Sequence, residues 1–149
     1  MGSASDMPVV QKAVNILERF QVPFAVTVAS AHRTPDLVES TVKESSAVAF
    51  IAVAGLSAAL PGVVASLTQR PVIGVPVSGK VNMDAILSVV QMPPGIPVGS
   101  VGLDRGENAA LLALRILAVG DRDILTKLEG YSLEMREKVI RSGKEVLGE

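Results

Sequence analysis

The sequence predicts an α/β fold, a three-layer α/β/α sandwich in which helices cover both faces of a parallel sheet. Short apolar runs alternate with helical patterns along the whole chain, which is the order that gives parallel strands and right-handed crossovers. The run from Ala47 to Ala54 is apolar throughout, which is typical of a strand buried on both faces. No linker, internal repeat or low-complexity tract interrupts the 149 residues, so we expect one domain over residues 1–149.

The first third of the chain predicts two helices on either side of a strand. Apolar residues from Val9 to Phe20 recur at helical spacing, and Asp6 is a candidate N-cap for that helix. Phe24 to Ala29 is a short apolar run and predicts a strand. Thr34-Pro35 then opens a second helix, which we expect to run to about Glu44.

The middle of the chain predicts two buried strands and a helix between them. Gly55 ends the strand of Ala47 to Ala54, and Leu56 to Thr68 follows with helical spacing that Pro61-Gly62 interrupts, which sets its first turn apart. Pro71 to Val77 is the next apolar strand. A polar loop comes after it, over Ser78 to Asn82.

The last third predicts three helices and a final strand. Met83 to Val90 has the length of a short helix, but Gln91 to Pro97 is not regular helix because its three prolines remove backbone donors. Val98–Leu103 is the last strand, and Ala109–Val119 is an apolar helix that we expect to be buried nearly all round. Asp121 then caps a charged helix that runs to about residue 143.

Composition excludes several classes of function. The formal net charge of −1 and the aromatic content of 3% give no case for nucleic-acid binding, which needs phosphate-neutralising cations and stacking surfaces. The chain has no Cys and one His, which excludes disulfides, thiolate zinc sites and a Cys nucleophile. We therefore expect no protein-built metal site.

The apolar content of 48% is high for a chain of this length. The longest apolar run is too short to cross a bilayer and no signal-peptide pattern is present, so we expect a cytoplasmic protein with no membrane partner. The excess apolar surface predicts a homo-oligomer, in which the helix from about residue 121 reaches a neighbouring subunit.

The candidate catalytic residues lie in the stretch from Ala29 to Pro35. This stretch holds the only histidine, His32, followed by Arg33, between a predicted strand and a predicted helix. Loops at the carboxyl ends of parallel strands are where ligands bind in such sheets. An imidazole beside a permanent cation suits acid/base chemistry on an anionic substrate. The alternative is that His32 is an exposed residue without a role.

A second candidate site is the small polar segment from Met1 to Asp6. The exposed amides of a helix start can hold a phosphate, and Ser3 and Ser5 add hydroxyl groups to it. The alternative is an ordinary capped helix, because a short Gly-Ser segment is a weak signal by itself.

Four segments in this order and spacing resemble one family. They are Gly2-Ser3-Ala4-Ser5-Asp6, Ser30-Ala31-His32-Arg33-Thr34-Pro35, Ala54 to Gly62, and Gln91 to Val98. Together they resemble the N5-carboxyaminoimidazole ribonucleotide mutase (PurE) family of purine biosynthesis, over nearly the whole chain. The segment from Asp104 to Leu112 resembles the archaeal branch of that family.

The resemblance implies a flavodoxin-like fold and an octamer with active sites between subunits. It implies movement of a carboxylate from the exocyclic amine of the ribonucleotide to a ring carbon, through carbon dioxide and without a cofactor or a metal. It assigns the 5′-phosphate to Ser3 and Arg33, the ribose hydroxyls to Asp6, and acid/base catalysis to His32. The other binding residues that it implies are Gly2, Ser5, Ser30, Gly55, Leu60 and Pro61.

Three features depart from the family's usual pattern. The sequence begins at Met1 without the strand that usually precedes the Gly-Ser segment, so we expect either a natural start further upstream or an altered sheet. Ala59 stands where the family commonly has a His, which removes a second imidazole from the implied pocket. The loop from Ser78 to Asp84 is shorter than in most bacterial members, and its Lys80 either faces the substrate or is simply solvated.

Two alternatives to the mutase remain open. One is a phosphoribosylaminoimidazole carboxylase of the same fold that uses carbon dioxide directly, although Arg33 after His32 resembles the mutase class. The other is a catalytically impaired nucleotide-binding or structural protein, which Ala59 and the absent strand favour and which His32, Arg33, Ser3 and Asp6 argue against.

Overall fold

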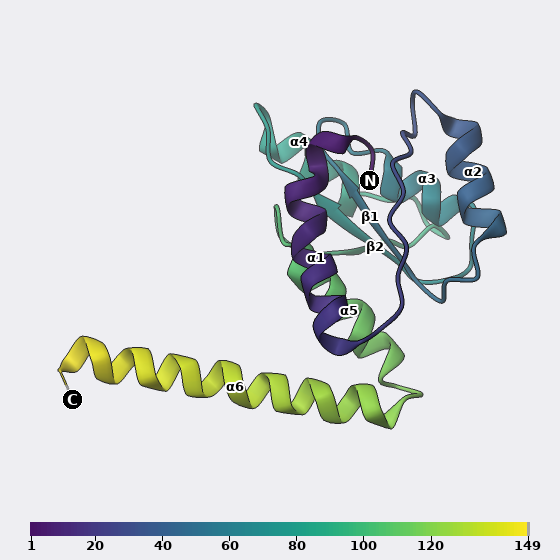
Figure 1. The fold of residues 1–149 in the computed structure, drawn as a ribbon. Coiled ribbons are helices and arrows are strands. Elements are labelled where there is room, and N and C mark those ends of the chain that lie inside the picture. Colours follow the sequence, from purple (N-terminus) through teal and green to yellow (C-terminus); the bar gives the residue numbers. More distant parts are fainter. Residues whose placement is uncertain (149) are drawn as a thin grey trace. The chain divides into compact units, whose positions relative to one another are not determined.

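A computed structural model describes residues 1–148, and it confirms the α/β fold with a parallel sheet. The chain divides into two compact units, Met1–Ala113 and the residues from Leu114 on. In the first unit the described strands run in the order β1-β2-β3, over Phe50–Ala54, Val72–Pro76 and Gly99–Ser100 (Figure 1). Both pairings are parallel, with Phe50 opposite Val72 and Ile73 opposite Gly99.

The predicted helices are present with shifted ends. A short 3-10 turn, η1 (Ala4–Asp6), leads into α1 (Met7–Phe20). The later helices of this unit are α2 (Pro35–Glu44), α3 (Leu60–Ser66), α4 (Asn82–Val90) and α5 (Gly106–Leu117). The helix predicted from Leu56 begins only at Leu60, because Leu56 and Ala58 have φ angles of 50° and 39° that helices do not use. Pro61 and Gly62 lie in its first turn, where a proline is tolerated.

Helices cover both faces of the sheet. A Cβ atom added to Gly74 of β2 would lie 2.5 Å from a methyl of Val89 in α4 and 3.1 Å from Pro61 in α3. A Cβ at Gly99 would instead lie 3.8 Å from Leu112 in α5. Gly99 is paired with Ile73, so a Cβ at Gly99 lies on the same face of the sheet as the Ile73 side chain. Successive residues of a strand face opposite sides, so a Cβ at Gly74 lies on the other face. Helix α5 therefore packs on the face opposite α3 and α4.

The prediction of a strand at Phe24–Ala29 is wrong. Residues 22–30 are extended, but they form no ladder with the sheet, and most of their side chains are exposed. Among the described residues, the backbone that lies along residues 24–29 is that of Met1: its amino group donates to Thr27 O over 2.8 Å, and its carbonyl accepts from Ala29 N over 2.9 Å. The apolar pattern was that of a strand, but strand structure also needs a neighbouring backbone along its length.

Two other strands are shorter than predicted. The run Ala47–Ala54 enters the ladder only at Phe50, and the run Val98–Leu103 contributes only Gly99–Ser100. β2 matches its prediction closely and is buried at every position. It is flanked by β1 and β3, which explains why its apolar sequence is uninterrupted.

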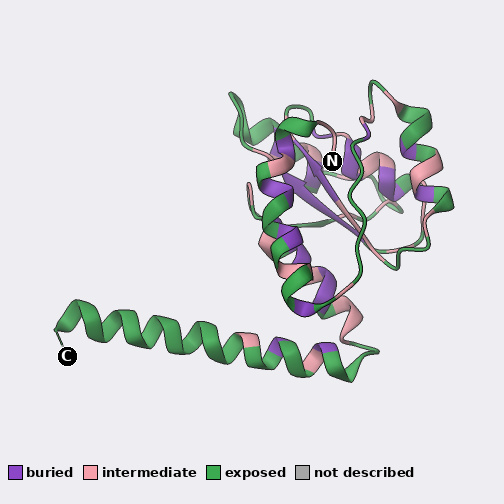
Figure 2. Ribbon diagram, viewed as in Figure 1, coloured by how far each residue is buried: buried purple, intermediate pink, exposed green. Residues whose placement is uncertain are grey.

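The hydrophobic core of the first unit lies against these strands. Figure 2 shows buried residues on β1 and β2 and on the inward sides of the helices around them. The core cluster joins residues of α2, β1, α3, β2 and α4, including Val38, Ala52, Val64, Val72 and Val89.

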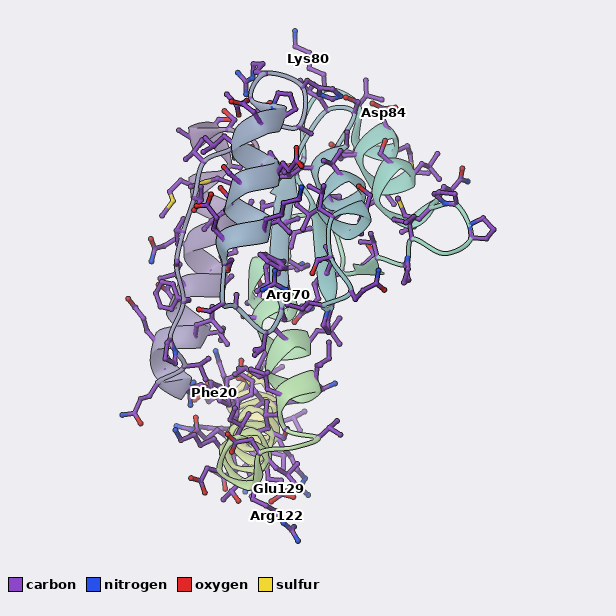
Figure 3. All side chains as sticks on the ribbon, turned by 90° about the vertical axis from the view of Figure 1, so that its right-hand side faces the viewer. Phe20, Arg70, Lys80, Asp84, Arg122 and Glu129 are labelled. Carbon is purple, nitrogen blue, oxygen red and sulfur yellow. The ribbon has the colours of Figure 1, made fainter. Side chains whose placement is uncertain are left out.

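Arg70 ties the end of α2 to the start of β1. Its guanidinium donates to Val42 O, Ser45 O and Ala47 O over 2.6 to 2.7 Å, and it stacks 4.6 Å from the centroid of the Phe50 ring. These carbonyls include acceptors of the last turn of α2 that have no partner within the helix, so the Arg70 side chain satisfies the carboxyl-terminal end of α2. Figure 3 shows Arg70 far from Lys80 and Asp84, which lie at the carboxyl-terminal side of β2.

The second unit consists of the end of α5 and the long helix α6 (Arg122–Leu147). The carboxylate of Asp121 accepts from Asp123 N and Ile124 N, which confirms the predicted cap. α5 is not buried nearly all round: Ala109 and Ala110 are fully buried, but Asn108 and Arg115 are exposed. Among the described residues no helix is both long and apolar enough to span a membrane.

Candidate active site

The turn that carries His32 and Arg33 is fixed by its neighbours on both sides. Ser30 N donates to the hydroxyl of Thr34 over 2.9 Å, and Thr34 N donates to Ser30 O over 2.9 Å. Pro35 then starts α2 with its φ already suited to a helix. These bonds close a tight turn, so His32 and Arg33 are held on its exposed outer side.

The guanidinium of Arg33 links this turn to the amino-terminal segment. Nε donates to the Ser30 hydroxyl over 3.2 Å, and Nη2 donates to Gly2 O over 3.0 Å. Arg33 is exposed, and within residues 1–148 its Nη1 has no hydrogen-bond partner. A guanidinium carries five N–H donors, so this one keeps donors for an anion while two of its nitrogens hold it in place.

The segment from Gly2 to Asp6 is anchored on β1. Gly2 N donates to Val53 O over 3.0 Å, which puts Gly2 at the carboxyl end of that strand. The hydroxyl of Ser3 accepts from Ser5 N over 3.3 Å and lies 2.9 Å from the Ser5 hydroxyl. Two serine hydroxyls thus lie next to each other at the start of the turn that leads into α1.

Asp6 is the N-cap residue of α1, as predicted, but its carboxylate makes no capping hydrogen bond to that helix. The residue is 7% exposed, and Oδ1 lies 3.4 Å from the Ser5 hydroxyl. Burial raises the pKa of Asp6, against the lowering effects of the Ser5 and Ser3 hydrogen bonds, the Met1 amino group and Arg33. Asp6 is therefore a desolvated carboxyl group close to two positive charges.

Gly55 follows β1 and adjoins both the amino-terminal segment and β2. A Cβ at Gly2 would lie 3.9 Å from Ala54 Cβ and 3.9 Å from Asp6 Oδ2, and a Cβ at Gly55 would lie 3.4 Å from Val77 O. Leu60 and Pro61 lie at the start of α3 and belong to the buried core, with Pro61 directed at Gly74. Ala59 is the N-cap residue of α3 and has no side chain that can cap it.

The structure thus brings together several residues that the sequence singled out separately. Arg33 contacts both Ser30 and Gly2, and Gly2 lies beside Asp6 and Ala54 at the carboxyl end of β1. His32 adjoins Arg33 on the exposed turn, whereas Leu60 and Pro61 are buried. The binding roles of all these residues stay predictions.

Sequence reasoning missed two residues that hold this region. Thr34 fixes the turn through its hydroxyl, and Asp104 accepts a hydrogen bond from Ser78 at the end of β2. The Thr-Pro helix start was a visible signal for Thr34. The contact of Asp104 joins segments 26 residues apart, and no local pattern indicates it.

In the described part of the chain, no group of three or more His, Cys, Asp or Glu side chains is arranged to hold a metal ion.

The fold and the site define a small α/β protein with a cationic turn at the carboxyl end of its parallel strands. The family model for AIR carboxylase matches residues 1–138, and the chain belongs to this family.

Relatives and solved structures agree with this membership. The N5-carboxyaminoimidazole ribonucleotide mutase of Methanocaldococcus jannaschii is 62% identical, over 98% of this chain and 94% of its own. The phosphoribosylaminoimidazole carboxylase of Saccharomyces cerevisiae is 45% identical, over 94% of this chain but only 25% of its own. The crystal structure of Treponema denticola PurE superposes with a TM-score of 0.89 at 33% identity, covering 97% of this chain and 94% of that one.

Proposed function

We propose that this chain is an N5-carboxyaminoimidazole ribonucleotide mutase. The observation that carries the proposal is the hydrogen bond from Arg33 Nη2 to Gly2 O, 3.0 Å long. This bond sets the His32-Arg33 turn beside the segment Gly2–Asp6, so a cation, two serine hydroxyls and a carboxylate meet at one end of the sheet. A phosphorylated ribose needs donors for its phosphate and an acceptor for its hydroxyls, and this set supplies both.

The charges divide the binding roles. A phosphate suits Arg33 and the hydroxyl of Ser3, because a guanidinium offers a fixed fork of N–H donors to oxygen anions. Asp6 would repel a phosphate, so its carboxylate suits the ribose hydroxyls. Burial makes its charged form costly, and hydroxyl donors from a ligand would offset part of that cost.

The proposed reaction moves one carboxylate and one proton in opposite directions. The bond between the exocyclic nitrogen and the carboxyl carbon breaks, and the nitrogen gains a proton. A bond from the ring carbon to the carboxyl carbon forms, and the ring carbon loses its proton. His32 is the imidazole on this turn, and imidazole is the side chain that enzymes use most often for proton transfer, so His32 is the proposed acid/base group.

Carbon dioxide, the proposed carrier of the carboxyl group, needs a pocket that keeps out water. Ala54 and Ala58, buried on either side of Gly55, give this end of the sheet an apolar interior.

The name of the yeast relative favours a second candidate function, direct carboxylation. A carboxylase takes the unmodified aminoimidazole ribonucleotide and carbon dioxide, whereas a mutase takes the N-carboxylated ribonucleotide. We expect the purified protein to form 4-carboxy-5-aminoimidazole ribonucleotide from the N-carboxylated substrate without added bicarbonate. The absorbance of the product measures the rate. Faster turnover of the unmodified ribonucleotide with bicarbonate would assign the carboxylase instead, and no turnover of either would leave a non-catalytic protein.

Replacing His32 tests its role within the mutase. We expect His32→Asn to keep substrate binding within a few-fold and to lower kcat by at least about 100-fold, because general acid–base catalysis contributes at least that much. Glu39→Gln on the exposed side of α2 is the matched control and should leave kcat unchanged. A His32→Asn variant that keeps most of its rate would remove His32 from the mechanism.

We also propose that the protein is a homo-oligomer, with the octamer of the family as the expected form. The support is apolar surface that the chain exposes on α6, where Leu133, Val139, Ile140 and Val146 recur near seven-residue spacing. Sedimentation velocity at micromolar concentration should show a species several times the chain mass of 15.5 kDa.

A charged residue in this stripe should weaken the assembly. We expect Ile140→Glu to shift the distribution toward smaller species, while Ser142→Glu, two residues further along the helix, should not. A wild-type profile at 15.5 kDa alone would overturn the oligomer.

A further inference from the structure

Asp104 joins three separate segments of the first unit. It follows β3, and its amide donates to Pro76 O over 2.9 Å at the end of β2. Its carbonyl accepts from Lys12 Nζ of α1 over 2.9 Å, and its carboxylate Oδ1 accepts from Ser78 N over 2.8 Å. The φ angle of 59° places Asp104 in the left-handed region, which Asp and Asn tolerate better than most residues.

The hydrogen bond to Ser78 is an anchor for an exposed loop. Residues 78–82 are all exposed, and a Cβ at Gly79 would meet nothing within 4 Å. The bond from Gly79 N to Asn82 Oδ1 joins the loop to the first residue of α4 and does not attach it to the sheet. In the described residues, the bond from Ser78 N to Asp104 is what holds the start of the loop to another segment.

This loop begins at the edge of the candidate active site. Val77 precedes it, and the carbonyl of Val77 borders Gly55, which follows β1. The amide of Val77 donates to Ala54 O over 2.9 Å, and Ala54 lies beside Gly2. A continuous path of contacts therefore runs from Arg33 through Gly2, Ala54 and Val77 to the loop.

The surroundings keep Asp104 charged. Burial acts to raise its pKa, but the hydrogen bonds from Ser78 and the charges of Lys12 and Arg105 outweigh this effect and lower it. A hydrogen bond to an ionised carboxylate is stronger than one between neutral groups.

We propose that Asp104 is a positioning residue that fixes loop 78–82 as one wall of the nucleotide site, through its carboxylate bond to Ser78 N. This inference rests on the proposed function. Among the described residues, the hydrogen bonds of Asp104 go to Pro76, Lys12 and Ser78 and not to His32 or Arg33, so we expect Asp104 to affect how well the substrate is held and not proton transfer. Losing the anchor should raise KM roughly tenfold and change kcat less than about threefold.

Glycine at position 104 isolates the carboxylate. Asp104→Gly accepts the positive φ without strain and keeps both backbone bonds, to Pro76 O and from Lys12, so the fold should be retained. Asp104→Asn keeps an oxygen in the place of Oδ1 and should restore KM to within about threefold of wild type. Asp84→Asn, on the first turn of α4 after the loop, is the control with the same loss of charge nearby.

The experiment measures KM and kcat of the four proteins with the N-carboxylated ribonucleotide, together with hydrogen exchange of residues 78–82. We expect raised KM and faster loop exchange in Asp104→Gly alone. Unchanged KM in Asp104→Gly, or a raised KM in Asp84→Asn as well, would overturn this inference and leave the proposed function standing. A wild-type protein without turnover would overturn the proposed function and this inference together.

Discussion

Asp6 and Arg33 show how the site combines a buried and an exposed charge. The carboxylate of Asp6 is 7% exposed, whereas the guanidinium of Arg33 is exposed to solvent and held by Ser30 and Gly2. Burial disfavours the charged form of Asp6 and raises its pKa, and the nearby Met1 amino group and Arg33 offset only part of this effect. A carboxylate kept in such surroundings is typical of a functional site, because stability alone does not favour it.

Because burial raises the pKa of Asp6, this residue should make the stability of the fold depend on pH. Its pKa is raised from 3.8, so the folded state holds the proton more tightly than the unfolded state does. The stability that this difference provides is fully present below 3.8 and is lost as the pH rises through the raised folded-state pKa. Asp6→Asn cannot titrate, so the free energy of unfolding of the variant minus that of wild type should increase from about pH 4 to about pH 7.

Urea denaturation at several pH values measures this difference. Asp6→Ala is the matched control: it also lacks the titrating group, so its pH slope should equal that of Asp6→Asn even where its absolute stability is lower. Parallel curves for wild type and Asp6→Asn would show that burial does not perturb the carboxyl group.

At the scale of elements, close packing depends on one glycine. Gly106 starts α5, and a Cβ there would lie 2.0 Å from Val9 O in α1. No side chain can occupy that position unless the two helices move apart. The sequence indicates a helix near this point but gives no sign that a second helix touches it.

Gly106→Ala should therefore destabilise the first unit although alanine favours helices. Overpacking of this kind costs about 2 to 3 kcal/mol, which exceeds the gain of about 1 kcal/mol in helix propensity. Gly79→Ala, where nothing lies within 4 Å, is the control and should change the free energy of unfolding by less than about 0.5 kcal/mol. Equal stability of the two variants in urea denaturation would contradict the observed contact.

Local sequence predicted some elements well and others poorly for a physical reason. β2 matched its prediction because its continuous apolar run reflects its burial. α2 matched because its Thr-Pro start is a signal within the segment itself. Residues 24–29 have a strand-like pattern, but within the described part of the chain only Met1 pairs with them, and pairing is not encoded in the segment itself. The same limit explains why the start of α3 was missed, because the positive φ at Leu56 and Ala58 has no Gly signal.

At the scale of the whole molecule, the order of strands and helices was predictable, apart from the strand at residues 24–29 that was expected to lead into the His32-Arg33 turn. The contacts between distant segments were not, because a backbone carbonyl such as Gly2 O accepts without any sequence signature. The family motifs named most of the residues that converge there. The exposed apolar residues of α6 raise the question of assembly at this scale, which sedimentation answers directly.

The clamp that Arg70 places on α2 has a consequence for motion at the candidate site. The helix carries the His32-Arg33 turn at one end and is held at the other by three carbonyl bonds and the Phe50 ring. The Ser30–Thr34 bonds hold the other end of α2, so the helix is restrained at both of its ends. We therefore expect α2 and the turn that it carries to keep their places when a nucleotide binds.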